Sequence, residues 1–226
     1  RLLHFYTQFG QDLSFLVLDS SGPQEAAENR VAVEAVHDIL ELDYRHCDRN
    51  FFDKCTWGLE QVRTPYVVLC ADDDVLFPET VGKAVEFLQD EPSFASAMGK
   101  IVEVSTMRRP WRRSIKILKG GPIRQERPMD RCRHPIRFST FYAVHRTSVL
   151  LEILHAIVSK IDSKVTLHLH EMSLKLLLML RGRLEVLPHL YAVRQQHSAN
   201  TSSIWWRGDV PDAERRYQQF KHFIAD

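Results

Sequence analysis

An almost continuous apolar segment near the middle of the chain most constrains what this sequence can fold into. Residues 64–71 read Thr-Pro-Tyr-Val-Val-Leu-Cys-Ala, with no alternation of polar and apolar positions. A strand with this pattern is buried on both faces, as in a parallel sheet that is covered by helices. The segment therefore predicts a buried strand within an α/β domain.

Apolar patterns on either side of this strand alternate between the two regular structures. The further strand-like segments are residues 13–18, 42–47, 94–104, 138–144, 184–187 and 190–193. The helix-like segments are residues 2–9, 24–40, 51–62, 149–158, 166–180, 211–224 and the stretch that begins at Pro78. Strands that alternate with helices predict an α/β fold with a mostly parallel sheet flanked by helices. A chain of 226 residues fits one sizeable domain over residues 1–226.

Three consecutive aspartates, Asp72, Asp73 and Asp74, follow the apolar strand directly. Ligands of α/β folds sit beyond the carboxyl ends of the strands, and adjacent carboxylates repel one another unless a cation or hydrogen bonds offset their charge. Mg²⁺ and Mn²⁺ prefer hard oxygen ligands and combine one or two carboxylates with substrate phosphates. The run therefore predicts a Mn²⁺ or Mg²⁺ site. The structural alternative is a polar turn that caps the helix opened by Pro78.

The segment Tyr66–Pro78 (YVVLCADDDVLFP) resembles the D-x-D region of GT-A inverting glycosyltransferases, particularly the large family 2 group. The usual pattern there is an apolar strand, Asp-x-Asp-Asp, three mostly apolar residues and proline. Anchoring on Pro78 places Ala71 at the first aspartate of that pattern, which is a departure from it. The metal-binding role then falls on Asp73 and Asp74, or on Asp72 and Asp74 if the D-x-D lies one residue along. The resemblance implies a GT-A (Rossmann-like) fold.

Two further segments extend this resemblance. Residues 16–21 (LVLDSS) are similar to the family's second strand, whose terminal aspartate contacts the nucleotide base, and this implies that Asp19 and Ser21 help to bind the nucleotide. Residues 141–146 (FYAVHR) resemble the later strand and turn beside the acceptor site. The family's first strand has no counterpart in the sequence. We therefore expect the chain to be part of a longer protein in which that strand lies before Arg1.

Three later residues are candidates for the remaining roles. An inverting transfer needs a general base that takes a proton from the acceptor hydroxyl, and Glu171, in the first turn of an apolar helix, matches where the family places its catalytic Asp or Glu. The helix dipole also favours a carboxylate there, which is the structural alternative. Arg194 and His197 follow the last strand-like segment. Both are candidates to contact the diphosphate. Alternatively, His197 completes the metal shell, as a C-terminal histidine does in some GT-A enzymes, or the segment is a polar loop.

The composition of the chain becomes strongly basic between residues 108 and 137. Eleven Lys or Arg residues stand there against two acids, Glu126 and Asp130, among several prolines and glycines. We expect an irregular insertion at about residues 106–136. Three roles stay open: a flap over the diphosphate, an attraction for a phosphate-containing acceptor or a membrane surface, and a solvated loop. No nucleic-acid-binding motif accompanies the charge, so we expect no nucleic acid partner.

The remaining features concern compartment and function class. No apolar stretch approaches the roughly 18 residues that span a bilayer. Four cysteines without C-x-x-C spacing favour a reducing compartment, the cytoplasm. If the basic stretch binds lipid, we expect the protein at the inner face of a membrane. The sequence predicts a metal-dependent glycosyltransferase that moves a sugar from a nucleotide-diphospho-sugar to a glycan, lipid-linked or other hydroxyl acceptor. The alternatives are a sugar-1-phosphate nucleotidyltransferase and a non-catalytic glycan- or phosphate-binding domain of the same fold.

Overall fold

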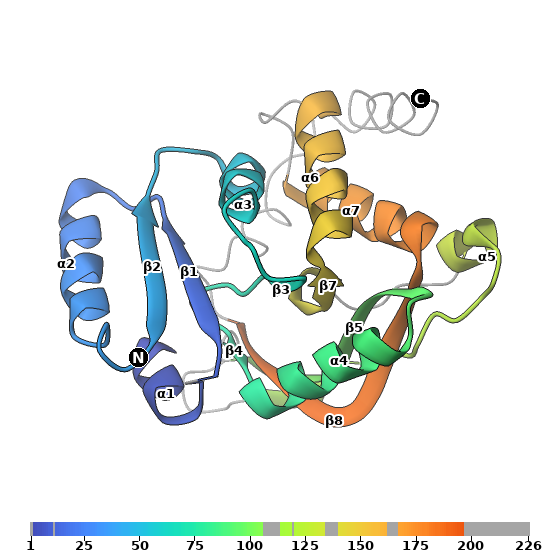
Figure 1. The fold of residues 1–226 in the computed structure, drawn as a ribbon, viewed down its shortest axis with the longest axis horizontal. Coiled ribbons are helices and arrows are strands. Elements are labelled where there is room, and N and C mark those ends of the chain that lie inside the picture. The colour runs from blue at the N-terminus through green and yellow to red at the C-terminus, as the bar shows by residue number, and fades with distance from the viewer. Residues whose placement is uncertain are drawn as a thin grey trace.

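The computed structural model describes residues 2–10, 12–105, 114–118, 120–133, 140–161 and 167–196. Within these ranges the strands form two sheets (Figure 1). The smaller sheet pairs β1 (Ser14–Asp19) with β2 (Glu41–His46), and α2 (Pro23–Glu34) lies against β2. Its strands are parallel, as expected for two strands joined by a helix.

The larger sheet has the strand order β3-β7-β5-β8-β4, with β6 added beside β5. Its strands are β3 (Tyr66–Val68), β4 (Val75–Leu76), β5 (Phe94–Ser105), β6 (Ser114–Ile117), β7 (Val144–Arg146) and β8 (Arg183–Gln196). The long β5/β8 ladder is parallel, while the shorter ladders β3/β7, β5/β7, β4/β8 and β5/β6 are antiparallel. The α/β class is thus confirmed. The larger sheet is mixed, because among its described strands the longest ladder, β5/β8, is parallel and the others are antiparallel. Strand β3, which the sequence predicts as a strand buried on both faces, is short, half-buried and antiparallel to β7.

Strand β8 merges the two strands that the sequence predicts at residues 184–187 and 190–193. The chain stays in the ladder because its register on β5 shifts on either side of Lys100. Gly99 lies at this irregularity, and a Cβ there would stand 2.6 Å from the His189 carbonyl oxygen. A second difference concerns residues 138–144, where a 3₁₀ turn, η1 (Thr140–Tyr142), precedes β7 in place of the predicted strand.

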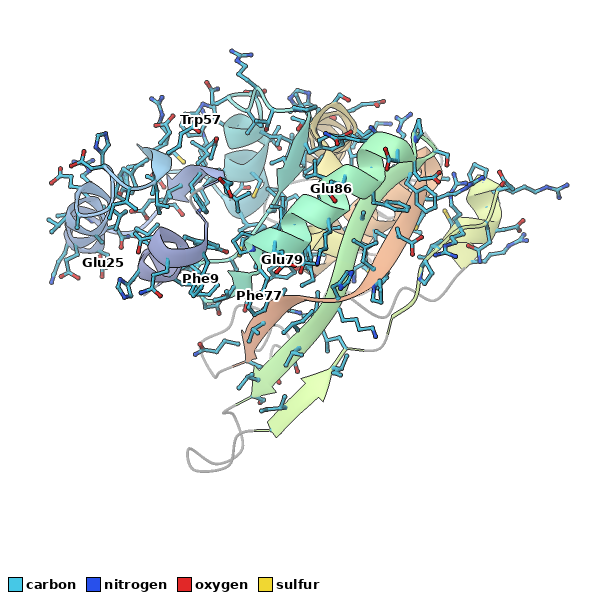
Figure 2. The ribbon with its side chains drawn as sticks, turned by 60° about the horizontal axis from the view of Figure 1, so that its bottom comes forward. Phe9, Glu25, Trp57, Phe77, Glu79 and Glu86 are labelled. Carbon is cyan, nitrogen blue, oxygen red and sulfur yellow. The ribbon has the colours of Figure 1, made fainter. Side chains whose placement is uncertain are left out.

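Helices cover both faces of the larger sheet. Residues 94–99 of β5 are all buried, which requires cover on each side of the strand. Figure 2 shows α4 (Pro78–Asp90) lying along β5 and β8, with Glu79 and Glu86 on its exposed surface. Helix α6 (Thr147–Lys160) contacts β7, and α7 (Leu167–Arg181) contacts β5 and β8. None of the described helices is both long and apolar enough to span a bilayer.

Two smaller helices complete the body of the fold. Helix α1 (Leu2–Phe9) places the Tyr6 hydroxyl 3.1 Å from the Leu76 amide, which donates a hydrogen bond to it. Helix α3 (Phe51–Leu59) begins after Asn50, whose side chain accepts a hydrogen bond from the Asp53 amide and so caps the first turn. The helix predicted at residues 211–224 lies outside the described residues.

The basic insertion contains two short elements among its described residues, strand β6 and helix α5 (Pro128–Arg133). Strand β6 pairs with β5, and Lys116 forms a 2.7 Å ion pair with Glu103. The buried Arg131 guanidinium donates to the carbonyl oxygens of Met179 and Leu180, at 2.6 and 3.2 Å, and so satisfies the end of α7. The described residues 114–118 and 120–133 are therefore less irregular than their glycines and prolines predict, because partners far along the chain hold them.

Candidate functional site

A tight turn divides the three aspartates among different environments. The Asp74 amide donates to the Ala71 carbonyl oxygen at 3.3 Å, so Asp72 and Asp73 occupy the two central positions of the turn. Asp72 is exposed, Asp73 is partly exposed, and Asp74 is buried with 2% of its surface accessible. The run thus presents two carboxylates outward and one inward.

The inward carboxylate of Asp74 is held by residues far along the chain. Its Oδ1 accepts a hydrogen bond from the Gln195 backbone amide at 2.7 Å, and its Oδ2 accepts one from the Tyr142 hydroxyl. The Arg194 Nε lies 3.5 Å from Oδ2, and the Arg194 guanidinium stands 5.0 Å from the centre of the Tyr142 ring. Burial raises the pKa of Asp74, although the hydrogen bonds from Tyr142 and Gln195 oppose that shift. The structure thereby brings the predicted residues Asp74 and Arg194 together.

Tyr142 and Gln195 were not predicted as parts of this site. Tyr142 belongs to η1, and its carbonyl oxygen accepts a hydrogen bond from the buried Tyr191 hydroxyl at 2.6 Å. Gln195 takes part through its backbone, for which the side-chain type gives no sequence signal. The strand-and-turn segment at residues 141–146 pointed to the right region but not to this contact.

Glu171 is partly exposed on α7 and lies one helical turn before Lys175. Burial lowers the pKa of Lys175, the Glu171 carboxylate opposes that shift, and the nearby Arg194 adds to it. Lys175 therefore lies within the electrostatic reach of both Glu171 and Arg194. Lys175 was not predicted as part of the site, although its spacing of four residues from Glu171 is that of side chains that meet on one helix face. The neighbouring His170 is buried and stacks on Phe52, with the ring centres 4.9 Å apart.

Asp19, at the end of β1, lies in the smaller sheet and is also buried. Its Oδ1 accepts hydrogen bonds from the Ser21 amide and hydroxyl, and its Oδ2 accepts from Asn29 at 3.0 Å and from the Tyr44 hydroxyl at 2.5 Å. Burial alone would raise the pKa of Asp19, but these hydrogen bonds outweigh it and hold the pKa well below its ordinary value. The predicted pair Asp19 and Ser21 is thus joined directly.

The donor set around the turn fits a divalent cation only if further ligands join it. Among the described residues, no three His, Cys, Asp or Glu side chains converge to hold a metal ion. Asp72 and Asp73 nevertheless offer carboxylate oxygens that face outward, while Asp74 is enclosed. This suits Mg²⁺ or Mn²⁺, which take one or two carboxylates and fill their shells with phosphate oxygens and water. The predicted ligand His197 lies outside the described residues.

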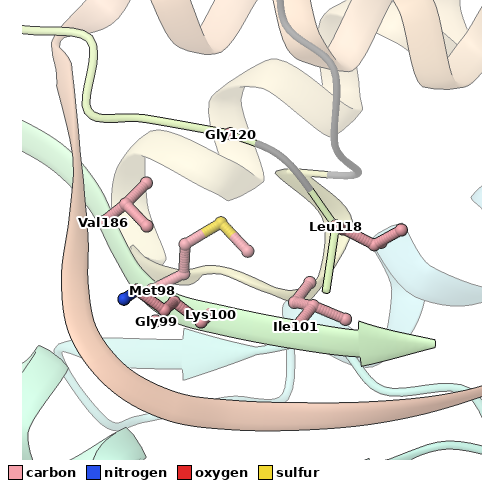
Figure 3. A pocket seen from close by; sticks show the side chains of 7 residues that line it. All are labelled: Met98, Gly99, Lys100, Ile101, Leu118, Gly120 and Val186. Atoms are coloured by element: carbon pink, nitrogen blue, oxygen red, sulfur yellow. The ribbon is translucent and has the colours of Figure 1, made fainter. Parts of the chain in front are cut away.

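A shallow pocket opens elsewhere, beside the irregularity of β5 (Figure 3). Met98, Ile101, Leu118 and Val186 supply most of its apolar lining, and none of the candidate site residues lines it. Its lining offers one charged residue, Lys100, and no carboxylate. We therefore do not assign this pocket to the site.

The fold and the site together define a class of protein. Helices flank a mixed sheet, an aspartate turn follows β3, Asp19 ends β1 of the smaller sheet, and Glu171 lies on a late helix. The fold is that of nucleotide-sugar transferases of the GT-A class. A family model described as glycosyl transferase family 2 matches residues 10–154. The chain belongs to glycosyl transferase family 2, and the predicted family is confirmed.

Solved structures of one protein, S. aureus TarS, resemble the chain in fold. TarS 1-349 in complex with UDP-GlcNAc is 16% identical with a TM-score of 0.59, and the match covers 97% of this chain and 60% of that chain. TarS 1-349 without a named ligand is 14% identical with a TM-score of 0.58, covering 99% of this chain and 67% of that chain. The complex of TarS 1-349 with UDP is 14% identical with a TM-score of 0.53, covering 97% and 65%.

The chain thus spans about 60% of the length of the first of these structures. Among proteins with curated descriptions, none matches it. The family match at residues 10–154 includes Asp19 and the aspartate turn, whereas Glu171 and Arg194 lie beyond it. Roles for these two residues therefore depend on the geometry described above.

Proposed function

We propose that this protein transfers a sugar from a nucleotide-diphospho-sugar to a hydroxyl acceptor, with a divalent cation bound at Asp72 and Asp73. The observation that carries the proposal is the turn at residues 71–74, which presents these two carboxylates outward while Asp74 secures Arg194 beside them. Membership of glycosyl transferase family 2 supports it, as do the UDP-GlcNAc and UDP complexes of TarS.

The diphosphate of the donor would lie between the cation site and two basic side chains. Arg194 stands beside the turn, and Lys175 is close enough to it for their charges to interact. Two partly buried cations repel one another, so an anion placed near both is favourable. When bound, Mn²⁺ or Mg²⁺ supplies neutralisation of the charge that develops on the departing diphosphate.

Glu171 is the proposed general base. It would accept the proton of the acceptor hydroxyl while the hydroxyl oxygen forms its bond to the anomeric carbon. The bond from that carbon to the diphosphate oxygen breaks in the same step, and its electron pair leaves on the nucleoside diphosphate. Attack from the face opposite the leaving group inverts the anomeric configuration.

We place the nucleotide base at the Asp19 end of β1. The four hydrogen bonds that Asp19 accepts hold Ser21 and Tyr44 around that strand end, giving a pre-formed polar edge. Because a carboxylate has about four acceptor positions, a base N–H that reached Asp19 would have to replace one of these donors. Ser21 is therefore as strong a candidate for this contact as Asp19 itself.

The acceptor is proposed to be a glycan or a lipid-linked glycan. The basic stretch would attract phosphate groups of such an acceptor or of a membrane surface, and β6 within it exposes Ile115 and Ile117, at 70% and 62%. We place the protein in the cytoplasm, in line with its four cysteines, all of which are free.

Calorimetric titration of UDP with and without Mn²⁺ tests this function. We expect Mn²⁺ to strengthen UDP binding at least about tenfold, equivalent to roughly 1.4 kcal/mol, and Asp72→Asn and Asp73→Asn to reduce that gain. Asp130→Asn, which changes a partly exposed acid of α5, serves as the matched control. Equal UDP affinity with and without the metal contradicts the proposed cation site. Metal-dependent binding without transfer or hydrolysis of any nucleotide-sugar would favour the non-catalytic alternative.

A further inference from the structure

Asp74 differs from its two neighbours in what its carboxylate can reach. Both of its oxygens already accept hydrogen bonds from the protein, one from the Gln195 amide and one from the Tyr142 hydroxyl. Only 2% of the residue is accessible. A cation that also binds substrate phosphates and water needs an open side, and Asp74 offers none. Its place in both sequence registers for the D-x-D motif therefore does not make it a ligand.

The position of Asp74 in the sheet explains what it does instead. Strands β4 and β8 are antiparallel, with Val75 opposite Val193 and Leu76 opposite Ala192. The β4/β8 ladder ends at Val75, and just beyond it the Gln195 amide donates to the Asp74 carboxylate. The side chain thus continues the attachment of β8 past the last ladder pair. The same carboxylate also fixes η1 through Tyr142.

Resting on the function proposed above, we infer that Asp74 is a positioning residue, which sets Asp72 and Asp73 against Arg194 by tying the aspartate turn to the end of β8 and to η1. The geometry of the turn supports a structural role for Asp74 and a ligand role for Asp72 and Asp73. Its closing hydrogen bond runs from the Asp74 amide to Ala71, so any movement of Asp74 displaces both central aspartates. Arg194 is fixed from the other side, because it precedes Gln195 and covers the Tyr142 ring.

Two substitutions weaken the contact between Asp74 and Tyr142, one at each of the two residues, and a third serves as their reference. Asp74→Asn keeps the shape of the side chain but removes the charge that attracts Arg194. Tyr142→Phe removes one hydrogen bond to Asp74 and leaves all three carboxylates in place. Asp73→Asn changes an outward carboxylate of the same turn and is the matched comparison.

The first measurement is UDP affinity by calorimetry, with and without Mn²⁺. We expect Asp74→Asn and Tyr142→Phe each to weaken metal-supported UDP binding by about five- to tenfold, the effect of one lost hydrogen bond to a charged group. Both variants should keep the gain in affinity that Mn²⁺ brings, and the double variant should be little worse than either one. Asp73→Asn should lose that gain. Loss of the gain in Asp74→Asn, with Tyr142→Phe unchanged from wild type, would show Asp74 to be a ligand and overturn the inference.

The second measurement needs no ligand. Hydrogen exchange of the backbone amides at residues 192–196 should become faster in Asp74→Asn and in Tyr142→Phe but not in Asp73→Asn. Unchanged exchange in the first two variants contradicts the positioning role. If the wild type binds no UDP under any condition, the proposed function fails, and this exchange experiment still decides the role of Asp74.

Discussion

Two strands of this protein end in a buried aspartate, yet the two carboxylates are stabilised in different ways. Asp19 and Asp74 are both enclosed, with 7% and 2% of their surfaces accessible. Burial raises the pKa of each, but four hydrogen bonds reverse that effect at Asp19 and lower its pKa, whereas the pKa of Asp74 stays raised. Asp74 receives two hydrogen bonds and has Asp73 beside it, whose charge opposes ionisation.

The difference shows that an aspartate at a strand end is not by itself a ligand. At the Asp19 end, four neutral donors saturate the carboxylate: one backbone amide, and three side chains that lie near it in the sequence or on the adjacent strand. At the Asp74 end, the turn separates one structural carboxylate from two outward ones. Under the proposed function, chemistry that needs a cation belongs to the second strand end, and recognition by hydrogen bonds belongs to the first.

The largest test of this contrast is Glu171→Gln. If transfer occurs at the Asp74 end, the base must lie on that side, where Lys175 links Glu171 electrostatically to Arg194. We expect the substitution to lower kcat by about 10²- to 10⁴-fold, the usual contribution of a general base, with UDP affinity changed little. Steady-state transfer kinetics with a nucleotide-sugar donor would measure this.

Glu152→Gln provides the control for that substitution, because Glu152 lies on α6 and forms a surface ion pair with Arg181. Its effect on kcat should be negligible. A wild-type kcat in Glu171→Gln would show that Glu171 is not the general base. It would contradict the assignment of the transfer step to the Asp74 end.

The pH dependence of stability should separate the two strand ends further. His145 in β7 is fully buried, accepts a hydrogen bond from the Ser96 hydroxyl at 2.7 Å, and donates one to the carbonyl oxygen of Thr140 in η1. Burial lowers the pKa of His145 from 6.5 to about 4. Between these two pKa values the unfolded chain binds a proton at His145 and the folded protein does not. The free energy of unfolding therefore falls as the pH drops. The loss approaches roughly 3 kcal/mol near pH 4.

Asp19 should behave differently over the same range. Its pKa is lowered on folding, so its stabilisation is complete above its ordinary value of 3.8 and is lost only below it. Urea unfolding at pH 7, 5.5 and 4.5 would therefore report His145, and unfolding below pH 4 would add Asp19. His145→Gln should flatten the upper range alone. A wild-type stability that is constant from pH 7 to 4.5 contradicts this account.

The two aspartates also differ in how well the sequence could predict their surroundings. The partners of Asp19 lie close along the chain or on the adjacent parallel strand, and the end of an apolar strand made Asp19 a visible candidate. The partners of Asp74 are Tyr142 and Gln195, which lie 68 and 121 residues away. No local pattern encodes such contacts, so the sequence placed Asp74 in both registers of the predicted metal site and did not reveal its burial. Periodicity predicted the helices that carry Glu171 and Pro78, because burial of one helix face is a local property.

The smallest expected effect, and the sharpest for the Asp19 end, comes from Tyr44→Phe. The Tyr44 hydroxyl donates to Asp19 Oδ2 at 2.5 Å from the neighbouring strand, and phenylalanine removes only that oxygen. Losing one hydrogen bond to a charged group should reduce the free energy of unfolding at pH 7 by about 2 kcal/mol. It should also let the pKa of Asp19 rise, so that acid unfolding begins at a higher pH. The control is Ser14→Ala at the start of β1, which removes a hydrogen bond to Glu41 on the same neighbouring strand. Both of those side chains are exposed and water replaces the bond, so this substitution should change neither quantity appreciably. Wild-type stability and an unchanged acid transition in Tyr44→Phe would mean that the remaining donors alone hold the charge of Asp19.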